Sequence, residues 1–458
     1  MSDSLSELMN KYDDILESPI LMETVNQPIQ IFEGDFVLKD DAREIKINGI
    51  IEYKWLPSTG IVFKGRPIGI SESIIDLLKS RDCYDVVCND DVMGKAYISD
   101  FSIGDGIDIK GVFHSNAILG DKTIPVDKIK FCIPNFRDFI GSTVKRITET
   151  SRHAYNNRIV LENDNYIIII DKNFDYKKSV SILNEKGGFF TLYSGELKAK
   201  KGILTFENSK EIFLCLNVFL SFLNGRRTSA LFSHGIYEEK VHWVDYTNYY
   251  VDSYKKLLSW TNSHSVIGFN ELWKEFSTKW KNLNDRDVLN TAVHWYMECN
   301  KSSGFIEGSL IMAQTALELL YNWFVVENKK LLIGKDSENI NASNKIRLLI
   351  SQLHIDYNVP KKFTALQKFL KSEKLIDAPE AVVQIRNAIV HSQEEKRIKL
   401  SKIDDRAKYE ALELCIWYIE ISLLKILKFR EKYSNRCSEK FVASAKIEKV
   451  PWLITVDY

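Results

Sequence analysis

The pattern of apolar and polar residues changes along the chain, from short alternating segments to long helical repeats. In the first part the apolar residues are mostly β-branched or aromatic and are interrupted by Gly, Asp and Pro, which is typical of β-strands. Segments with this pattern are residues 29–38, 43–55, 60–65, 94–103 and 106–113. The pattern therefore predicts a β-rich N-terminal region with a sandwich or barrel-like architecture.

Two further features are expected within this β-rich region. Residues 158–171 predict a hairpin that turns at residues 163–165, Asn-Asp-Asn, because these residue types tolerate a left-handed backbone. The second arm, residues 167–170, lacks polar alternation and should form a central strand covered on both faces. Residues 71–80 are the one helix expected among these strands.

Helical periodicity then replaces the strand pattern. Residues 211–225 predict an apolar helix that ends at Gly225, a common residue after a helix C-terminus. Arg226 and Arg227 follow, where cations suit the negative end of the helix dipole. The alternative is that they form an anion-binding or docking pair. After a short strand-like stretch, residues 240–246, almost the whole chain has the pattern of helices.

Two long segments, residues 304–327 and 409–429, carry the apolar stripe of a bundle helix. In both, apolar residues recur at steps of three and four. The stripe residues are Leu310, Ala313, Leu317, Leu320 and Phe324 in the first segment, and Leu412, Cys415, Ile416, Ile419, Leu423, Ile426 and Leu427 in the second. Such helices with short links favour an antiparallel bundle.

These patterns divide the chain into four parts. We expect a β-rich sensor or recruitment domain over 1–208, a connecting helical region over 209–284, a helical bundle over 285–436 and a C-terminal tail over 437–458. The expected fold class is multidomain α and β, with a β-rich sandwich or barrel-like domain before an all-α bundle. A chain of 458 residues exceeds what one hydrophobic core usually spans, which agrees with this division.

Charge and composition limit the function classes. Lys+Arg and Asp+Glu are both 62, so the formal net charge is zero and an RNA site would have to be a local basic patch. The polar N-terminal segment lacks a signal-peptide pattern, and no run reaches the ~18 apolar residues of a membrane helix. The seven cysteines are scattered without a CxxC pair. We therefore expect a cytoplasmic protein with reduced thiols and no membrane contact.

Residues 378–391 carry the best candidate for chemistry. Asp377 predicts a helix N-cap, and Glu380 three residues later would complete a capping box. Projected at about 100° per residue, the apolar side chains cluster on one side of this helix. They are Val382, Ile385 and Ile389.

Polar residues occupy another face of the same helix. Asn387 and His391 are four residues apart and share a stripe roughly opposite the apolar cluster. A core histidine would lie with the apolar side chains, and this one does not. Arg386 falls at the border between the faces, where its guanidinium can turn toward the polar side.

The sequence Arg386-Asn387-Ala388-Ile389-Val390-His391 resembles the Arg-x4-6-His motif of the HEPN superfamily, which has a polar residue after the arginine in its commonest form. Residues 316–320, Ala-Leu-Glu-Leu-Leu, are similar to a signature of many HEPN members. A long apolar helix follows the motif and ends in residues 432–436, Lys-Tyr-Ser-Asn-Arg. This resemblance covers residues 285–436.

More loosely, the whole chain resembles bacterial anti-phage-defence HEPN proteins of the ApeA type, which place a β-rich domain before the helical nuclease. Residues 187–191, Gly-Gly-Phe-Phe-Thr, and 220–226, Leu-Ser-Phe-Leu-Asn-Gly-Arg, are similar to that group. The likeness implies an RNA-cleaving effector that a phage-derived trigger activates through the β-rich domain.

The resemblance implies a metal-independent endoribonuclease that needs no cofactor. The RNA 2′-hydroxyl would be the nucleophile, His391 would transfer protons, and Arg386 would stabilise charge on the phosphate. Asn387 would orient the imidazole. Glu318 would either tether Arg386 or be a solvated helix residue. The implied partners are RNA, with tRNA as one candidate, and a second copy of the chain that completes the site in a homodimer.

Two alternatives to an active nuclease stay open. The first is a non-catalytic HEPN module that binds RNA, a nucleotide or a partner through the same polar face, beside a ligand-sensing β domain. The second is a two-domain binding protein whose β domain recognises carbohydrate or a phage protein while the bundle dimerises. An exposed stripe with Arg, Asn and His favours the nuclease, because a scaffold does not need these residues there.

Overall fold

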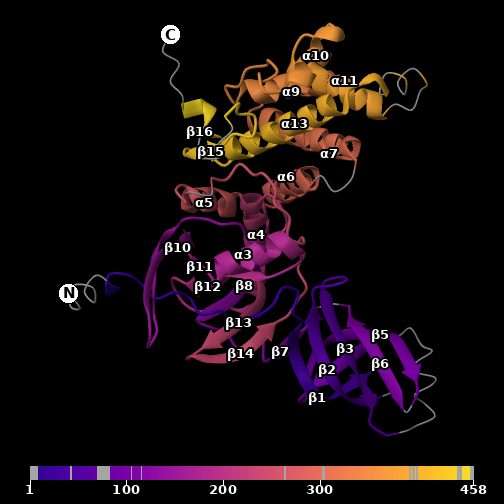
Figure 1. The fold of residues 1–458 in the computed structure, drawn as a ribbon, viewed down its shortest axis with the longest axis vertical. Helices are drawn as coiled ribbons and strands as arrows, with labels where there is room; N and C mark the ends of the chain where they lie inside the picture. The colour runs from indigo at the N-terminus through magenta and orange to yellow at the C-terminus, as the bar shows by residue number, and fades with distance from the viewer. Residues whose placement is uncertain are drawn as a thin grey trace. The chain divides into compact units, whose positions relative to one another are not determined.

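The computed structural model contains two compact units (Figure 1). The first consists of Met1–Phe136, Gly141–Asn217 and Thr228–Lys256, and the second of Arg137–Ile140, Val218–Arg227 and Leu257–Tyr458. The chain therefore passes between the units more than once. The residues that the structure describes are 9–41, 44–69, 83–104, 106–114, 116–262, 265–301, 305–390, 394, 398, 401–440 and 446–453.

A closed antiparallel barrel forms the beginning of the first unit, with the strand order β1-β2-β3-β6-β5-β4. Its strands are β1 (Ile29–Lys39), β2 (Glu44–Lys54), β3 (Gly60–Pro67), β4 (Tyr84–Cys88), β5 (Asp91–Ile103) and β6 (Ile107–Phe113). Alternate side chains such as Ile47, Ile51 and Phe63 point inward and are buried. The predicted β-rich N-terminal region is therefore confirmed. The helix expected at residues 71–80 lies outside the described residues.

An eight-stranded antiparallel sheet forms the rest of this unit, in the order β7-β14-β13-β8-β12-β11-β10-β9. Its strands are β7 (Ile118–Gly120), β8 (Lys128–Pro134), β9 (Ser142–Ile147), β10 (Arg152–Glu162), β11 (Tyr166–Lys172), β12 (Thr191–Ala199), β13 (Leu231–Tyr237) and β14 (Lys240–Asp245). The strand-like stretch expected near residue 240 is confirmed as β14. The neighbouring strand β13 was not predicted.

The predicted hairpin is formed by β10 and β11, which pair in antiparallel register. The Asn163 side chain accepts hydrogen bonds from the backbone N–H groups of Asn165 (3.0 Å) and Tyr166 (3.2 Å), which fixes the turn. Strand β11 lies inside the sheet, and its Ile168 and Ile170 are buried. Ile167 and Ile169, which point to the opposite face, are only half-buried. The expectation of full cover on both faces was therefore wrong for one face.

Two helices accompany the sheet. The helix α3 (Tyr176–Lys186) was not predicted, because few of its side chains, among them Leu183, are buried and its apolar pattern is weak. The helix α4 (Phe206–Asn224) begins earlier than expected and ends as predicted at Gly225. That glycine has φ 72° and donates its N–H to the Ser221 carbonyl at 2.9 Å.

The position of α4 bears on the expected domain boundaries. The boundary expected after residue 208 lies inside this helix, whose two ends belong to different units. The region 209–284, expected to be a helical connection, also contains β13 and β14. The sheet therefore continues well beyond the predicted end of the β-rich domain.

The second unit is mainly helical, as predicted for the C-terminal part of the chain. Its helix α13 packs against α6, α7, α10 and α11. Its elements are α5 (Phe269–Trp280), α6 (Leu283–Lys301), α7 (Ile306–Tyr321), the π-helix η1 (Asn322–Asn328), α8 (Lys335–Asn339), α9 (Ala342–Ser351), α10 (Thr364–Ser372), α11 (Ala378–Val390), α13 (Asp405–Ile426), β15 (Lys432–Ser434), β16 (Ile447–Lys449) and the 3-10 helix η3 (Pro451–Leu453).

Both predicted apolar stripes are buried. Leu310, Ala313, Leu317 and Leu320 lie in α7, and the stripe of α13 is buried along its whole length. Phe324 continues the first stripe in η1, where the wider π-helical turn interrupts the α-helical repeat. The strand β16, which lies within the expected tail at 437–458, pairs with β15.

A buried polar network links α6, α13 and the segment after α13. The guanidinium of Arg436 donates to both carboxylate oxygens of Glu420, at 2.9 and 2.6 Å, and to Glu413 at 3.2 Å. It also donates to the Asn300 side chain at 3.1 Å, and the Tyr296 hydroxyl donates to Glu420 at 2.8 Å. Burial opposes the charge of Arg436, yet the two carboxylates raise its pKa. The network is therefore a satisfied element of the core.

One helical stretch, α7 with η1, is long and apolar enough to cross a membrane by length and composition alone. No such stretch was expected from the sequence, because polar residues interrupt its apolar run. In the structure 56% of its most apolar window is buried, and it packs against α6, α9 and α13.

Candidate functional site

The N-terminus of α11 forms as predicted. Asp377 accepts a hydrogen bond from the backbone N–H of Glu380 at 3.0 Å, as an N-cap should. The Glu380 carboxylate accepts from the backbone N–H of Ile376 at 2.7 Å, one residue before the position of the expected capping box. These contacts fix the start of the helix that carries Arg386 and Asn387.

Asp377 also ties α11 to α9. The guanidinium of Arg347 donates to both of its carboxylate oxygens, at 2.6 and 2.9 Å, and this hydrogen bonding raises the pKa of Arg347. Asp377 is buried, so the ion pair is shielded from water. A two-point contact between planar groups restricts rotation, and it therefore holds the two helices in a defined arrangement.

A second contact fixes α11 against α7. The buried side chain of Gln314 donates to the Val382 carbonyl at 2.9 Å, one helical turn before Arg386. Val382 and Ile385 lie in the core as predicted, whereas Ile389 is only half-buried. The apolar face of α11 therefore ends sooner than expected, because the last turn of the helix is more exposed.

Arg386 and Asn387 are both half-buried and contact each other. The Nη1 atom of Arg386 donates to the Asn387 side-chain oxygen at 3.3 Å. The HEPN resemblance implied that Asn387 orients His391, whereas in the structure the Asn387 side-chain oxygen accepts from the arginine. His391 lies outside the described residues. The structure therefore brings together two of the three residues of the motif.

Arg386 lines a small polar cavity between α7, α9 and α11, with a volume of about 140 Å³. Drug-sized ligands usually occupy about 300–1,000 Å³, whereas one water takes roughly 30 Å³. The cavity thus suits a few waters or one phosphate group rather than a whole nucleotide. The other lining residues are Gln314, Thr315, Glu318, Ala342, Lys345 and Ile346.

Glu318, expected either to tether Arg386 or to be a solvated helix residue, lines the same cavity as Arg386. Its carboxylate forms an ion pair with Lys345, and 55% of its side chain is exposed. Among the described residues no ion pair joins Glu318 to Arg386. Glu318 therefore shares the cavity with the arginine, and it is paired with the lysine of α9.

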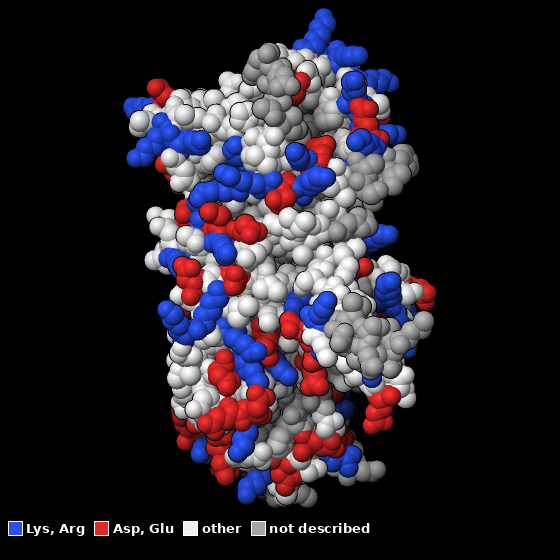
Figure 2. Space-filling model, turned by 90° about the vertical axis from the view of Figure 1, so that its left-hand side faces the viewer, with Lys and Arg blue, Asp and Glu red and all other residues white. Residues whose placement is uncertain are grey.

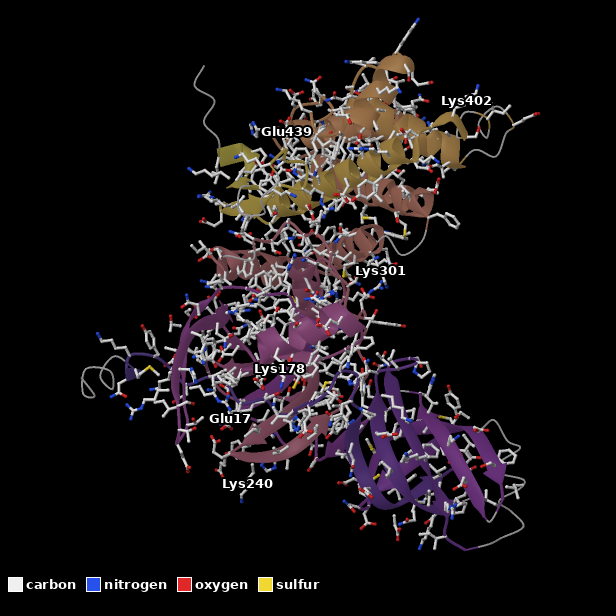
Figure 3. The ribbon with its side chains drawn as sticks, in the orientation of Figure 1. Glu17, Lys178, Lys240, Lys301, Lys402 and Glu439 are labelled. Atoms are coloured by element: carbon white, nitrogen blue, oxygen red, sulfur yellow. The ribbon has the colours of Figure 1, made fainter. Side chains whose placement is uncertain are left out.

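Lys345 and Gln314 were not identified from the sequence. Gln314 lies next to the apolar stripe of α7, where a glutamine is easily taken for a surface residue. Lys345 lies in α9, whose place beside α7 follows only from tertiary packing. Figure 3 shows side chains filling the space among α7, α9, α11 and α13. No local pattern could have indicated that Lys345 and Arg386 line one cavity.

A second polar cluster contains Arg227 and His294, two residues that no sequence pattern had placed together. Arg226 is buried, and Arg227 forms an ion pair with Glu298 of α6 at 2.6 Å. His294 of α6 contacts Arg227 through Nδ1 at 2.9 Å. A guanidinium only donates hydrogen bonds, so Nδ1 accepts and the proton of the neutral imidazole is on Nε2. Partial burial and the charge of Arg227 lower the pKa of His294.

Charges of both signs are interspersed on the face that Figure 2 shows, in agreement with the zero net charge. Within the described ranges no group of three or more His, Cys, Asp or Glu side chains is placed to hold a metal ion. Positive charge that could attract a nucleic acid is therefore local, as in the cavity of Arg386 and Lys345.

Comparison with known proteins places this cavity in a region shared with other proteins. Residues 282–448 match the model of the YopA C-terminal domain, and residues 121–257 match the model of the YopA central domain. The chain is 27% identical over 444 residues to the SPbeta prophage-derived uncharacterized protein YopA of Bacillus subtilis (strain 168). This match covers 95% of the chain and 98% of that protein. No solved structure matches the chain. The chain is thus similar to a prophage protein over almost its whole length, and the Arg386 cavity falls within the matched C-terminal region.

Proposed function

We propose that the chain is a metal-independent endoribonuclease of the HEPN type that acts as an RNA-cleaving effector in bacterial anti-phage defence. One observation carries the proposal. The half-buried guanidinium of Arg386 lines a polar cavity, and no carboxylate in the described part of the chain forms an ion pair with it. Its positive charge is therefore available to a phosphate, five residues before His391.

The chemistry follows from these residue types. The 2′-hydroxyl oxygen of RNA attacks the adjacent phosphorus while a base removes its proton, and the bond from phosphorus to the 5′-oxygen breaks as that oxygen gains a proton. His391 can serve in either proton role, because an imidazole titrates near neutral pH. The products are a 2′,3′-cyclic phosphate and a 5′-hydroxyl. No metal-bound water is needed, because the substrate supplies the nucleophile.

Arg386 and Asn387 have separate roles in this proposal. The guanidinium stabilises the negative charge that develops on the phosphate oxygens in the transition state. Asn387 accepts a hydrogen bond from Arg386 at 3.3 Å, so it acts by holding the guanidinium in place. It is a positioning residue, since it contacts the arginine.

The partners follow from the same proposal. The substrate is RNA, with tRNA as one candidate, and two copies of the chain bring their α11 helices together in a homodimer. The β-rich part of the chain detects a phage-derived trigger in the cytoplasm. The relative in Bacillus subtilis is named as prophage-derived, which fits an effector that acts during phage infection.

The decisive experiment compares the wild type with His391→Ala, using total RNA from expressing cells and purified protein with a labelled RNA. The wild type should cleave RNA, with or without chelator, and leave cyclic phosphate ends, whereas His391→Ala should not. His354→Asn is a matched control, because His354 is exposed in the same unit and Asn tolerates its φ of 56°.

Two outcomes would contradict the nuclease. The first is a folded His391→Ala protein that cleaves at the wild-type rate. The second is a wild type that binds RNA but still does not cleave it when the phage trigger is present. The second outcome would support the non-catalytic binding module instead.

A further inference from the structure

Lys345 is the second cation of the Arg386 cavity. It lies in the first turn of α9, where its backbone N–H donates to the Asn341 carbonyl at 3.0 Å. Its side chain is only 15% exposed, and its ammonium group is 5.9 Å from the centre of the Tyr321 ring. The side chain is thus held along α7, with its charge at the cavity.

The charges of the cavity do not cancel. Arg386 and Lys345 are cations, and Glu318 is the one acidic residue among those that line the cavity. The lining therefore carries one excess positive charge. A cavity of about 140 Å³ with two cations suits a single dianionic or monoanionic phosphate group better than a neutral ligand.

The ion pair between Glu318 and Lys345 is unequal. The lysine side chain is mostly buried, whereas 55% of the glutamate side chain is exposed. The carboxylate can return to water at little cost, but the buried ammonium group requires another anion in its place. An incoming phosphate can thus replace Glu318 without leaving a buried charge unpaired.

The two cations are fixed relative to each other. Arg347, two residues after Lys345, forms the two-point ion pair with Asp377 at the start of α11. Gln314 fixes α7 to α11 one turn before Arg386. The spacing between the two cations is therefore set before any ligand binds.

We propose that Lys345 is a second phosphate ligand beside Arg386, and that Glu318 is a counter-ion which the RNA phosphate displaces. The identity of the ligand as RNA rests on the proposed function. Glu318 then competes with the incoming phosphate for Lys345, and this competition weakens the binding of RNA. This assigns Lys345 a binding role that its sequence context does not indicate.

The test measures binding apart from cleavage. A fluorescent 2′-O-methyl oligouridylate is the probe, because its methylated 2′-oxygen cannot attack the phosphate. Its affinity for the full-length protein is measured by anisotropy over a range of KCl concentrations. The variants are Lys345→Met, Lys345→Arg and Glu318→Gln, with Lys371→Met as the control because Lys371 is exposed on α10.

Lys345→Met should bind about tenfold more weakly, and its salt slope should fall by about 0.7, which is the share of one phosphate contact on a single strand. Lys345→Arg should keep the wild-type slope, because it keeps the charge. Glu318→Gln should bind several-fold more tightly, since the competing carboxylate is gone. Lys371→Met should behave as the wild type.

Two outcomes would overturn the assignment of Lys345. One is an unchanged salt slope in a folded Lys345→Met protein, and the other is weaker binding in Glu318→Gln. Failure of the nuclease proposal alone gives a different result. The wild type would then bind the probe and the variants would change that binding as stated, but unmethylated RNA would stay intact.

Discussion

Two arginines of the helical unit show how similar side chains can serve different purposes. Arg436 is buried and directs four hydrogen bonds to Glu420, Glu413 and Asn300. Arg386 is half-buried, and it donates a hydrogen bond to the neutral side chain of Asn387. One guanidinium has its charge neutralised inside the core, and the other forms no ion pair with a carboxylate in the described part of the chain.

The difference lies in what surrounds each arginine rather than in the arginine itself. Two carboxylates offset the cost of burying Arg436, so removal of any member leaves an unpaired group in the core. Arg386 borders a cavity where Glu318 supplies the one carboxylate among the described lining residues, and that carboxylate is paired with Lys345. The core arginine should therefore control stability, and the cavity arginine should control activity.

The largest effect is expected from Arg436→Met. It leaves Glu420 and Glu413 buried without their cation, so the free energy of unfolding should fall by about 3–5 kcal/mol. Urea denaturation followed by circular dichroism measures this change. A loss below about 1 kcal/mol would mean that the network is not a structural element, and the contrast with Arg386 would disappear.

Arg386→Ala should have the opposite pattern, with a large loss of activity and little loss of stability. Loss of charge stabilisation in the transition state should lower the cleavage rate by about 10²–10³, or roughly 2.7–4 kcal/mol. The free energy of unfolding should change by less than about 1 kcal/mol, because no buried charge loses its partner. A folded Arg386→Ala protein with the wild-type cleavage rate would show that the two arginines do not differ in this way.

Asp377→Ala tests how much the contacts that hold α11 against α9, beside the cavity, contribute to stability. Loss of the N-cap and of the contact with Arg347 should lower the free energy of unfolding by about 1–2 kcal/mol. Asp377→Asn is the control, because it keeps a capping oxygen and removes only the charge. If Asp377→Asn destabilises as much as the alanine, the ion pair outweighs the cap.

The smallest effect is expected from Asn387→Ala. It removes one hydrogen bond to Arg386, so the cleavage rate should fall roughly two- to tenfold. Single-turnover cleavage at saturating RNA separates this loss from weaker binding. A decrease as large as that of Arg386→Ala would indicate that Asn387 contacts a reacting group directly.

Local sequence patterns predicted the elements that depend on neighbours in the chain. The Asn163 turn and the start of α11 at Asp377 formed as expected, because the side chain and the backbone groups it bonds are within three residues. The stop of α4 at Gly225 follows from a single left-handed residue. The apolar stripes of α7 and α13 were identified for a similar reason, since burial repeats with the helical period.

Features that depend on distant contacts were not predictable. The helix α3 buries few side chains and leaves a weak pattern, and β13 gains its place only by pairing with β8 and β14. The contact of His294 with Arg227 joins residues 67 positions apart. The motif from Arg386 to His391 indicated where chemistry could occur, but the cavity with Lys345 required the packing of α7 on α9.

The interleaved division of the chain has a practical consequence for anyone who expresses part of this protein. A fragment that begins at Leu257 would omit Arg137–Ile140 and Val218–Arg227, which belong to the helical unit. Asn300 would lose the Gly225 carbonyl that its side chain bonds at 2.8 Å, and Thr261 would lose Arg137. During synthesis on the ribosome, segments made early must likewise wait for the last 200 or so residues before this unit can close.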